Sequence, residues 1–354
     1  MEIKKMLASN LKPEPDWQNL GFGNVFTDHM FIMDYTEGQG WHDARIVPYA
    51  PLEIDPAALV LHYGAEVFEG MKAYYAGEDK ILLFRPEANA QRINKSSARL
   101  CIPAFPEEVF LQALKELIRV ERRWVPRLPE TSLYIRPLVI STEAQLGVKR
   151  GDKYVFLIIL SPVGAYYPEG LNPVKIFVET EYVRSVRGGT GFTKCGGNYA
   201  AGLVAQYKAR QMGYSQVLWL DGAERKYIDE VGTMNVMFKV NGQVLTPELE
   251  TGTILPGVTR DSVLKLLQSW GIPTAERRIT LEELQQAALD GTLEEAFGTG
   301  TAAVIAPIGE LNINGEKVVI SNGQIGPLTQ KIYTALTDIQ WGRTEDTFGW
   351  TVEV

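Results

Sequence analysis

Lys194 has the sequence surroundings of a reactive amine. It lies in the segment RGGTGFTKCGGNYA (187–200), between two glycine-rich stretches and before a predicted helix with Asn198 as its expected N-cap. Glycines allow close approach to a ligand, and an amine drawn out of water loses proton affinity and can form a Schiff base. No Gly-Lys-Ser/Thr sequence follows, which excludes a Walker A loop. Lys194 is therefore either a covalent catalyst or, like most lysines, an exposed side chain.

Two other glycine-containing segments could bind anions. LPGVT (255–259) opens a predicted helix whose first N–H groups, with the Thr259 hydroxyl, could hold a phosphate; the alternative is an ordinary helix start. GTGTAA (298–303) matches the GxGxxA pattern, but β-branched residues follow it and end at Pro307, so no dinucleotide-binding helix is expected. We predict a tight turn whose amides could hold a carboxylate.

Several charged residues have two open interpretations. Glu230 follows a strand-like stretch and could pair with a ring nitrogen or complete a turn. Tyr134 and Arg136 share one face of a predicted strand, either as a carboxylate clamp or as an edge with an exposed arginine. Arg92 could hold an anion or be a solvated helix charge.

The composition excludes several classes of protein. The 354 residues hold 35 basic and 43 acidic side chains, a net charge of −8, which is unfavourable for binding nucleic acid or anionic membranes. Scarce histidine and cysteine exclude zinc fingers, multi-histidine metal sites and disulfide scaffolds, so no metal site is predicted. Catalysis must then use lysine, tyrosine, carboxylates, hydroxyls or a cofactor. The scarce residues are His29, His42, His62, Cys101 and Cys195.

No targeting segment is recognisable. Residues 1–17 are polar and lack the apolar region of a signal peptide, and the apolar run 154–160 is too short to span a bilayer. Two distant cysteines fit a reducing compartment, so we expect a cytoplasmic protein. Cys101 is expected to be a packing residue.

Periodicity and turn residues predict the elements. Strands are expected at 26–35, 67–75, 81–84, 132–140, 154–160 and 174–179, with Pro137 marking an edge or a bulge. Helices are expected at 86–100, 106–124, 199–212, 258–270, 281–289 and 327–341. Hairpin turns are expected at Asp221-Gly222, Asn241-Gly242 and Asn314-Gly315.

Hairpins and helices are intermingled and do not follow a regular βαβα order, which favours an α+β fold or a barrel-like mixed sheet. Residues 162–173 (PVGAYYPEGLNP) are rich in Pro and Gly and have no periodicity. We therefore expect an N-terminal domain at 1–162, a linker at 163–173 and a larger domain at 174–354.

The ordered set of motifs resembles the branched-chain amino-acid aminotransferases, class IV pyridoxal-phosphate enzymes of fold type IV. The resemblance covers residues 21–341. Its motifs are GFGNVFTDHM, LHYGAEVFEGMKAY, FRPEANAQRI, YIRPLV, GGTGFTKCGGNYA, DEVGTMNV, ILPGVTRDS and FGTGTAAVIAPI.

The resemblance implies an α+β architecture with a small α/β N-terminal domain, a larger mixed β-barrel-like C-terminal domain, and pyridoxal 5'-phosphate between them. Lys194 would hold the cofactor covalently and act as the catalytic base. The other implied cofactor contacts are Tyr199 at the phenolic oxygen, Glu230 at the pyridine nitrogen, Arg92 and the amides of Val258 and Thr259 at the phosphate, and Thr233 and Thr301.

The resemblance also assigns the substrate contacts and a homodimer. The α-carboxylate would meet the amides of Thr301 and Ala302 and the Tyr134 hydroxyl, and Arg136 would accept the second carboxylate of glutamate. The side-chain pocket would be lined by Phe22, Tyr63, Phe68 and Thr233, and Leu146 and Val148 would reach the neighbouring subunit's site.

The implied activity is transfer of the amino group of L-leucine, L-isoleucine or L-valine to 2-oxoglutarate. A D-amino-acid aminotransferase and an aminodeoxychorismate lyase share the fold and are the nearest alternatives. A silent cofactor-binding protein is a third, against which intact Lys194, Tyr199 and Glu230 argue. Animal relatives carry a Cys-x-x-Cys pair where this chain has Ala303 and Ala306, so no thiol switch is expected there.

Overall fold

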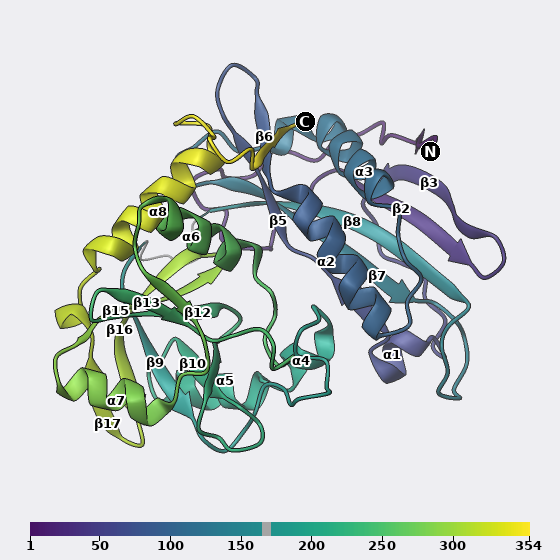
Figure 1. Cartoon of the computed structure of the whole chain (residues 1–354). Coiled ribbons are helices and arrows are strands. Elements are labelled where there is room, and N and C mark those ends of the chain that lie inside the picture. The colour runs from purple at the N-terminus through teal and green to yellow at the C-terminus, as the bar shows by residue number, and fades with distance from the viewer. Residues whose placement is uncertain (165–170) are drawn as a thin grey trace. The chain divides into compact units, whose positions relative to one another are not determined.

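The computed structural model describes residues 1–164 and 171–354, which form two compact units (Figure 1). Of the described residues, the first unit holds 1–164, Thr193–Gly196 and Asp338–Val354. The second holds 171–192 and 197–337. Each unit is built on its own β-sheet, so each has a separate core.

The sheet of the first unit is antiparallel except at one edge, where β1 runs parallel to β3. Its strands, in spatial order, are β1 (Lys4–Lys5), β3 (Gly40–Pro48), β2 (His29–Thr36), β8 (Lys153–Val163), β7 (Ser132–Ser141), β5 (Met71–Tyr75), β6 (Ile81–Phe84) and β18 (Thr351–Glu353), with β4 (Glu66–Phe68) also on β7.

Helices cover this sheet because their apolar residues recur at helical spacing. On α3 (Glu107–Val120), buried Phe110, Leu114 and Ile118 share one face and join Phe31 and Phe156 of the sheet in one core. The unit's remaining helices are α1 (Leu59–Tyr63), α2 (Pro86–Arg99) and the 3₁₀ turn η1 (Arg122–Trp124).

Pro137 was expected to mark an edge or a bulge, but β7 is an internal strand and its pairing with β8 has no register shift. On one side Pro137 pairs with Ile158 of β8. On the other it faces the break between β4 and β5, where the Glu69 N–H donates to the Pro137 carbonyl at 2.8 Å. The missing proline N–H thus falls where the neighbouring strand is interrupted.

The second sheet mixes parallel and antiparallel pairs. Its order is β11 (Ile228–Val231), β10 (Gln216–Leu220), β9 (Val174–Glu179), β16 (Val304–Ile313), β15 (Leu293–Gly300), β12 (Asn235–Val240), β13 (Gln243–Thr246) and β14 (Thr274–Glu276), with β17 (Glu316–Val319) on β16.

This second sheet curls, because its two ends meet. The Ile228 N–H at the start of β11 donates to the Ile279 carbonyl, three residues after β14, and Tyr227 bridges Thr280. The predicted α+β class and barrel-like mixed sheet are confirmed. The helices that accompany the sheet are α4 (Gly196–Ala200), α5 (Leu203–Gln211), α6 (Val258–Ser269), α7 (Leu281–Leu289), α8 (Pro327–Gln340) and the 3₁₀ turn η2 (Ser321–Gly323).

Most predicted elements are confirmed, and the exceptions have local causes. The helix expected at 199–212 is divided into α4 and α5 near Gly202, where a Cβ would lie 3.1 Å from the Trp219 ring. Asn198 is not an N-cap; it lies inside α4, and its side-chain amide donates to the Thr190 carbonyl. Cys101 is exposed rather than packed, and its φ of 57° lies in the left-handed region.

The expected domain limits differ from the compact units at two segments. Asp338–Val354 belongs to the first unit because β18 pairs with β6. Thr193–Gly196 belongs there because the Phe68 N–H donates to the Lys194 carbonyl. The linker expected at 163–173 lies largely outside the described residues, so that boundary stays a prediction.

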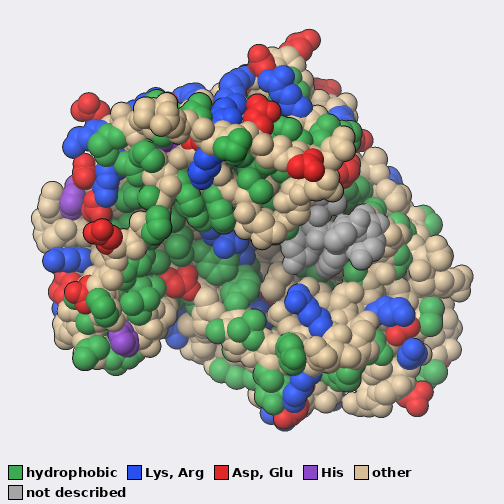
Figure 2. All heavy atoms as spheres, turned by 180° about the vertical axis from the view of Figure 1, so that it is seen from behind, with side chains coloured by type: hydrophobic (Ala, Val, Ile, Leu, Met, Phe, Trp, Pro, Cys, Tyr) green, Lys and Arg blue, Asp and Glu red, His purple; other side chains and the backbone are tan. Residues whose placement is uncertain are grey.

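In the described parts of the chain, the helices are all too short or too polar to cross a membrane. Acidic and basic side chains are interspersed on the face shown in Figure 2.

Candidate active site

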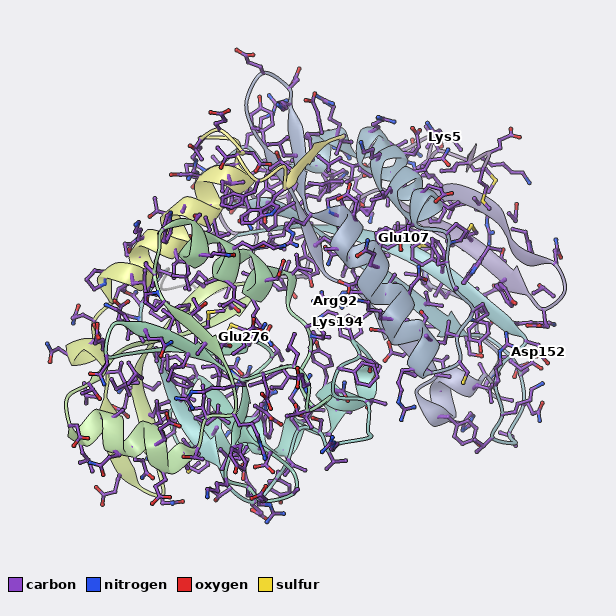
Figure 3. The ribbon with its side chains drawn as sticks, viewed as in Figure 1. Lys5, Arg92, Glu107, Asp152, Lys194 and Glu276 are labelled. Atoms are coloured by element: carbon purple, nitrogen blue, oxygen red, sulfur yellow. The ribbon has the colours of Figure 1, made fainter. Side chains whose placement is uncertain are left out.

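Lys194 is held by its backbone, which is not what a flexible surface loop would show. Its N–H donates to the Ser96 hydroxyl of α2 at 2.9 Å, and its carbonyl accepts from the Phe68 N–H of β4 at 2.9 Å. The ammonium nitrogen lies 4.9 Å from the centroid of the Phe68 ring. The lysine therefore has a defined position beside α2, as the labelled residues in Figure 3 show.

The glycine after Cys195 is required by a close approach. The Gly196 N–H donates to the Glu66 carboxylate, and a Cβ on Gly196 would lie 2.4 Å from Glu66 Oε1. The glycine thus lets the lysine segment pass directly over β4.

Arg92 forms a buried bidentate ion pair with Glu69. Arg92 Nε donates to Glu69 Oε1 at 2.7 Å and Nη2 donates to Oε2 at 2.9 Å, while the Asn89 amide donates to Oε2 at 2.8 Å. Burial favours a neutral Glu69, but the positive charges of Arg92 and Lys194 outweigh it and hold the pKa of Glu69 below its usual value. Arg92 is thus a fixed cation near Lys194, not a solvated helix charge.

Tyr134 and Arg136 of β7 share a face, as predicted. Arg136 Nη2 donates to the Tyr134 hydroxyl at 3.1 Å, and the guanidinium lies 4.8 Å from the centroid of the Phe68 ring. Phe22 packs edge-on against Tyr134 with ring centroids 5.0 Å apart. Among the described residues, Arg136 Nε is buried and has no hydrogen-bond partner. These side chains therefore form one wall, which combines the aromatic surface of three rings with the cationic donor of Arg136. The wall consists of Phe22, Phe68, Tyr134 and Arg136.

The remaining predicted residues of the first unit lie together away from its core. Tyr63 ends α1, is exposed, and donates its hydroxyl hydrogen bond to the Leu146 carbonyl. Leu146 and Val148 follow β7 in a loop and are 66% and 80% exposed.

In the second unit, Glu230 is a buried carboxylate on β11. Its Oε2 lies 3.0 Å from Arg184 Nε, and its Oε1 accepts from the Leu255 N–H at 2.7 Å. Arg184 in turn donates to the Gly191 and Thr253 carbonyls, which fixes the ion pair.

Tyr199, Glu230 and Thr233 line one pocket of this unit. Tyr199 comes from α4, Glu230 from β11, and Thr233 from the turn that joins β11 to β12. The pocket's other lining residues include Arg184, Asn198, Gln206, Trp219 and Leu255.

The two predicted anion-binding segments are a helix start and a turn. Val258 and Thr259 open α6 after Gly257, which has no side chain to cap the helix; a Cβ there would lie 2.0 Å from Asn235 Oδ1. Thr301 and Ala302 form the turn between β15 and β16. A strand follows this turn, and not the helix that a dinucleotide-binding GxGxxA segment would need. Val304 closes that turn at φ of 60°, a strained conformation for a β-branched residue.

Sequence reasoning missed Glu69, Ser96 and Arg184. Glu69 stands in the quoted motif LHYGAEVFEGMKAY, but only the fold brings it to Arg92. Ser96 lies one helical turn after Arg92 on α2, a spacing that could have linked the two. No sequence signal marks Arg184.

Known proteins share both the sequence and the fold. The profile of the Amino-transferase class IV family matches residues 66–311. Branched-chain-amino-acid aminotransferase 2 of Bacillus subtilis (strain 168) is 56% identical over 352 residues, which cover 99% of this chain and 97% of that protein.

Solved structures with a similar fold are also branched-chain amino acid aminotransferases. The branched-chain amino acid aminotransferase of Escherichia coli has a TM-score of 0.76 and 28% identity, and the match covers 91% of this chain and 98% of that one. The T.th. branched-chain amino acid aminotransferase complexed with N-(5'-phosphopyridoxyl)-L-glutamate has a TM-score of 0.74 and 26% identity, with 90% and 97% covered. Its complex with 4-methylvaleric acid has a TM-score of 0.72 and 25% identity, with the same coverage.

Proposed function

The chain belongs to the class IV amino-transferase family, and from this premise we propose that it transfers the amino group of L-leucine, L-isoleucine or L-valine to 2-oxoglutarate. Membership makes it a pyridoxal 5'-phosphate-dependent transaminase of the fold type IV architecture. The names of its relatives support the branched-chain substrates.

Each unit contains groups of the kind that bind pyridoxal 5'-phosphate. The start of α6 and the fixed Arg92 guanidinium are each a kind of group that suits a phosphate, and the buried Glu230 carboxylate suits a protonated ring nitrogen. We propose that Arg92, Lys194, Tyr199, Glu230, Thr233, Val258, Thr259 and Thr301 hold one cofactor molecule. Bound there, the cofactor supplies an electron sink for the Cα carbanion of the amino acid.

The protein's own groups would move the proton. Lys194 Nζ takes the proton from the substrate Cα and returns it on the reverse course, as a general base and acid. The backbone contacts of Lys194 to Ser96 and Phe68 restrict where this amine can reach. Arg184 keeps the Glu230 carboxylate oriented, so its charge is placed before the substrate arrives.

One observation carries the choice of substrates: the buried Arg136 Nε has no hydrogen-bond partner among the described residues, and the Phe68 ring lies beside its guanidinium. A cationic donor suits the second carboxylate of glutamate, while the aromatic rings of Phe22, Phe68 and Tyr134 suit an aliphatic side chain. The same wall can thus serve both partners of the exchange, with Tyr63 and Thr233 completing the side-chain pocket. The α-carboxylate would contact Tyr134, Thr301 and Ala302.

The test is a substrate panel with purified holoenzyme and 2-oxoglutarate. We expect glutamate to form with L-leucine, L-isoleucine and L-valine, and the yellow enzyme to bleach with L-leucine but not with D-alanine. Equal bleaching by D-alanine would contradict the L-specific assignment and favour a D-amino-acid aminotransferase. Bleaching without any 2-oxo acid product would contradict transamination.

We also propose a homodimer, in which Leu146 and Val148 contact the neighbouring subunit's site. Their exposure at the end of a loop fixed by Tyr63 supports this. The cytoplasmic location predicted from cysteine usage stays a prediction.

A further inference from the structure

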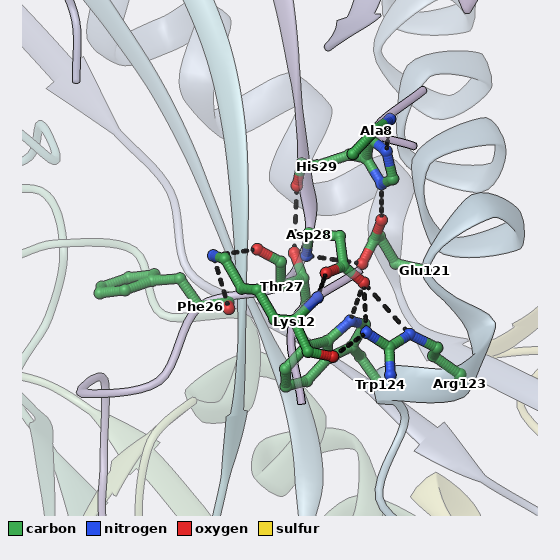
Figure 4. Close-up of polar contacts among 9 residues, drawn as sticks. All are labelled: Ala8, Lys12, Phe26, Thr27, Asp28, His29, Glu121, Arg123 and Trp124. Carbon is green, nitrogen blue, oxygen red and sulfur yellow. Dashed lines mark hydrogen bonds and ion pairs between the residues drawn. The ribbon is translucent and has the colours of Figure 1, made fainter. Parts of the chain in front are cut away.

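Lys12 ties together the two ends of the loop that carries Phe22. Its N–H donates to Asp28 Oδ1 at 2.7 Å. Its ammonium group donates to the carbonyls of Phe26 at 3.1 Å and Thr27 at 2.7 Å (Figure 4). The lysine therefore closes residues 13–27 into a loop by both main-chain and side-chain contacts.

Aromatic contacts fix the same end of the loop. The Phe26 ring stacks on the Tyr49 ring with centroids 5.0 Å apart and planes 6° from parallel, and the Lys12 ammonium lies 4.5 Å from the Tyr49 centroid. Burial lowers the pKa of Lys12, while the nearby Asp28 carboxylate acts against that shift. Lys12 is thus a partly desolvated cation with specific partners.

Asp28 is itself anchored to the end of the α3 region. Its Oδ2 accepts hydrogen bonds from Arg123 Nη2 at 2.6 Å and from Trp124 Nε1 at 2.7 Å. The hydrogen bonds of Lys12 are therefore connected through Asp28 to the core of the first unit, since Trp124 is buried there.

Phe22 depends on such ties because its own backbone is irregular. It lies between Gly21 and Gly23, with φ of 61° and 77°. The Gly21 carbonyl accepts from the Gly164 N–H at 3.0 Å. On the other side only three residues separate Phe22 from Phe26, whose carbonyl Lys12 holds. The position of the Phe22 ring against Tyr134 is set between these two points.

We infer that Lys12 is a positioning residue for substrate selection: by holding the Phe26 and Thr27 carbonyls it places Phe22 in the aliphatic side-chain pocket. The inference rests on the proposed function, because that function makes Phe22 a wall of the pocket. It assigns a role to the N-terminal segment outside the pocket. If the Phe22 ring is held less firmly, an aliphatic substrate side chain loses more of its contact with the pocket than glutamate does. The second carboxylate of glutamate depends on Arg136 instead.

The neighbouring Asp28, His29 and Glu121 offer metal-type ligand atoms, but hydrogen bonds already occupy them. The Ala8 N–H donates to His29 Nε2 at 2.8 Å, and His29 Nδ1 contacts Glu121 Oε1. Glu121 Oε2 accepts from the Asp28 N–H at 3.0 Å. The cluster is therefore part of the same anchoring network.

The test compares Lys12→Met with Lys5→Met in the holoenzyme. Lys5 lies in the same N-terminal segment, but its ammonium binds Glu116 on α3. The measured quantity is the ratio of kcat/KM for L-leucine to kcat/KM for L-glutamate, which loss of folded protein alone does not change. We expect the ratio to fall about tenfold in Lys12→Met, the range for a poorly filled apolar pocket. It should stay within about twofold in Lys5→Met, since the Lys5 ammonium binds Glu116 on α3.

Two further variants decide whether Lys12 acts through Phe22. In a Phe22→Ala background, Lys12→Met should change the ratio little, because the group it positions is gone. Lys12→Arg, which keeps a cationic donor, should restore most of the ratio. An unchanged ratio in Lys12→Met, or an equal fall with and without Phe22, would overturn the inference.

A binding measurement removes turnover from the comparison and covers a poorly folding variant. Lys12→Gln keeps one donor group and is the milder substitution. We expect its Kd for 4-methylvaleric acid to rise more than its Kd for glutaric acid; equal changes would contradict the inference. The wild-type assay tests the proposed function, which is wrong if the enzyme does not transaminate L-leucine. The variants test only the role of Lys12.

Discussion

Glu69 holds the Arg92 guanidinium with both of its carboxylate oxygens, at 2.7 and 2.9 Å, and has no exposed surface itself. Two parallel hydrogen bonds fix the plane of a guanidinium as well as its position. A buried partner of this kind is costly to remove, because the remaining charge is left unpaired.

Glu69→Gln should weaken cofactor binding without removing a cofactor contact. The amide loses the negative charge that orients Arg92, so the Kd for pyridoxal 5'-phosphate should rise about 10- to 100-fold, as when a supporting partner of a ligand is lost. Titration of the apoenzyme with the cofactor measures this. The matched control is Glu87→Gln, an exposed glutamate in the first turn of the same helix, and an equal effect there would contradict the assignment.

Lys194→Ala should abolish transamination while the protein stays folded. Loss of the proposed base and covalent anchor should lower kcat by at least about a thousandfold. The variant should also lack the yellow colour of the lysine-bound cofactor. Retained turnover with a native circular-dichroism spectrum would refute the role of this lysine.

Arg136→Met should separate the two substrates. Methionine keeps an apolar surface for the aliphatic side chain but removes the donor for a second carboxylate. We expect kcat/KM for L-glutamate to fall about 10- to 100-fold, the usual loss for hydrogen bonds to a charged group. The value for L-leucine should change by only a few-fold, and parallel losses for both substrates would be the contrary result.

Asp229 makes stability depend on pH. Burial raises the pKa of Asp229 to about 7, and the neighbouring Glu230 and Asp221 add to the effect, although the Thr253 hydroxyl opposes it. A raised pKa means that the folded state binds the proton more tightly than the unfolded state. The favourable contribution is therefore complete below about pH 4 and is lost as the pH rises towards and past 7.

Asp229→Asn removes this titration and can still accept the hydrogen bond from Thr253. Relative to the wild type, it should gain stability between pH 5 and 8, by at most about 4 kcal/mol. Urea unfolding at several pH values measures the gain. Asp290→Asn, at an exposed aspartate, should run parallel to the wild type. A wild-type curve parallel to that of Asp229→Asn would contradict the prediction.

Val148→Asp should weaken the proposed dimer, because a charge replaces an 80% exposed apolar side chain at the expected interface. Sedimentation equilibrium should show a dimer Kd at least about tenfold higher. Val319→Asp, at an exposed valine of β17, is the control and should leave the Kd unchanged.

Elements with local signals were predictable from sequence. Residues 281–289 form α7 as expected because Thr280 caps them, its hydroxyl accepting from the Glu283 N–H at 2.9 Å. The hairpin turns at Asn241-Gly242 and Asn314-Gly315 also formed, since left-handed residues define them.

Features that depend on distant partners were not predictable. Asn198 has the composition of a cap, but Thr190 uses its side chain instead. Glu69 and Arg184 gain their roles only when β4 meets α2 and when β11 meets the 184–191 segment. The roles assigned to the site residues came from the resemblance to a family, because spacing alone left each of them with a second interpretation.

The first sheet takes its last strand from the C-terminal end of the chain, which affects how the protein folds during synthesis. Its outer strand β18 consists of Thr351–Glu353, and the lysine segment that rests on β4 is residues 193–196. A ribosome has therefore made the whole second unit before the first can be finished. We expect the nascent first unit to leave the β6 edge open during translation, and the lysine to be seated well after its sheet has begun to form.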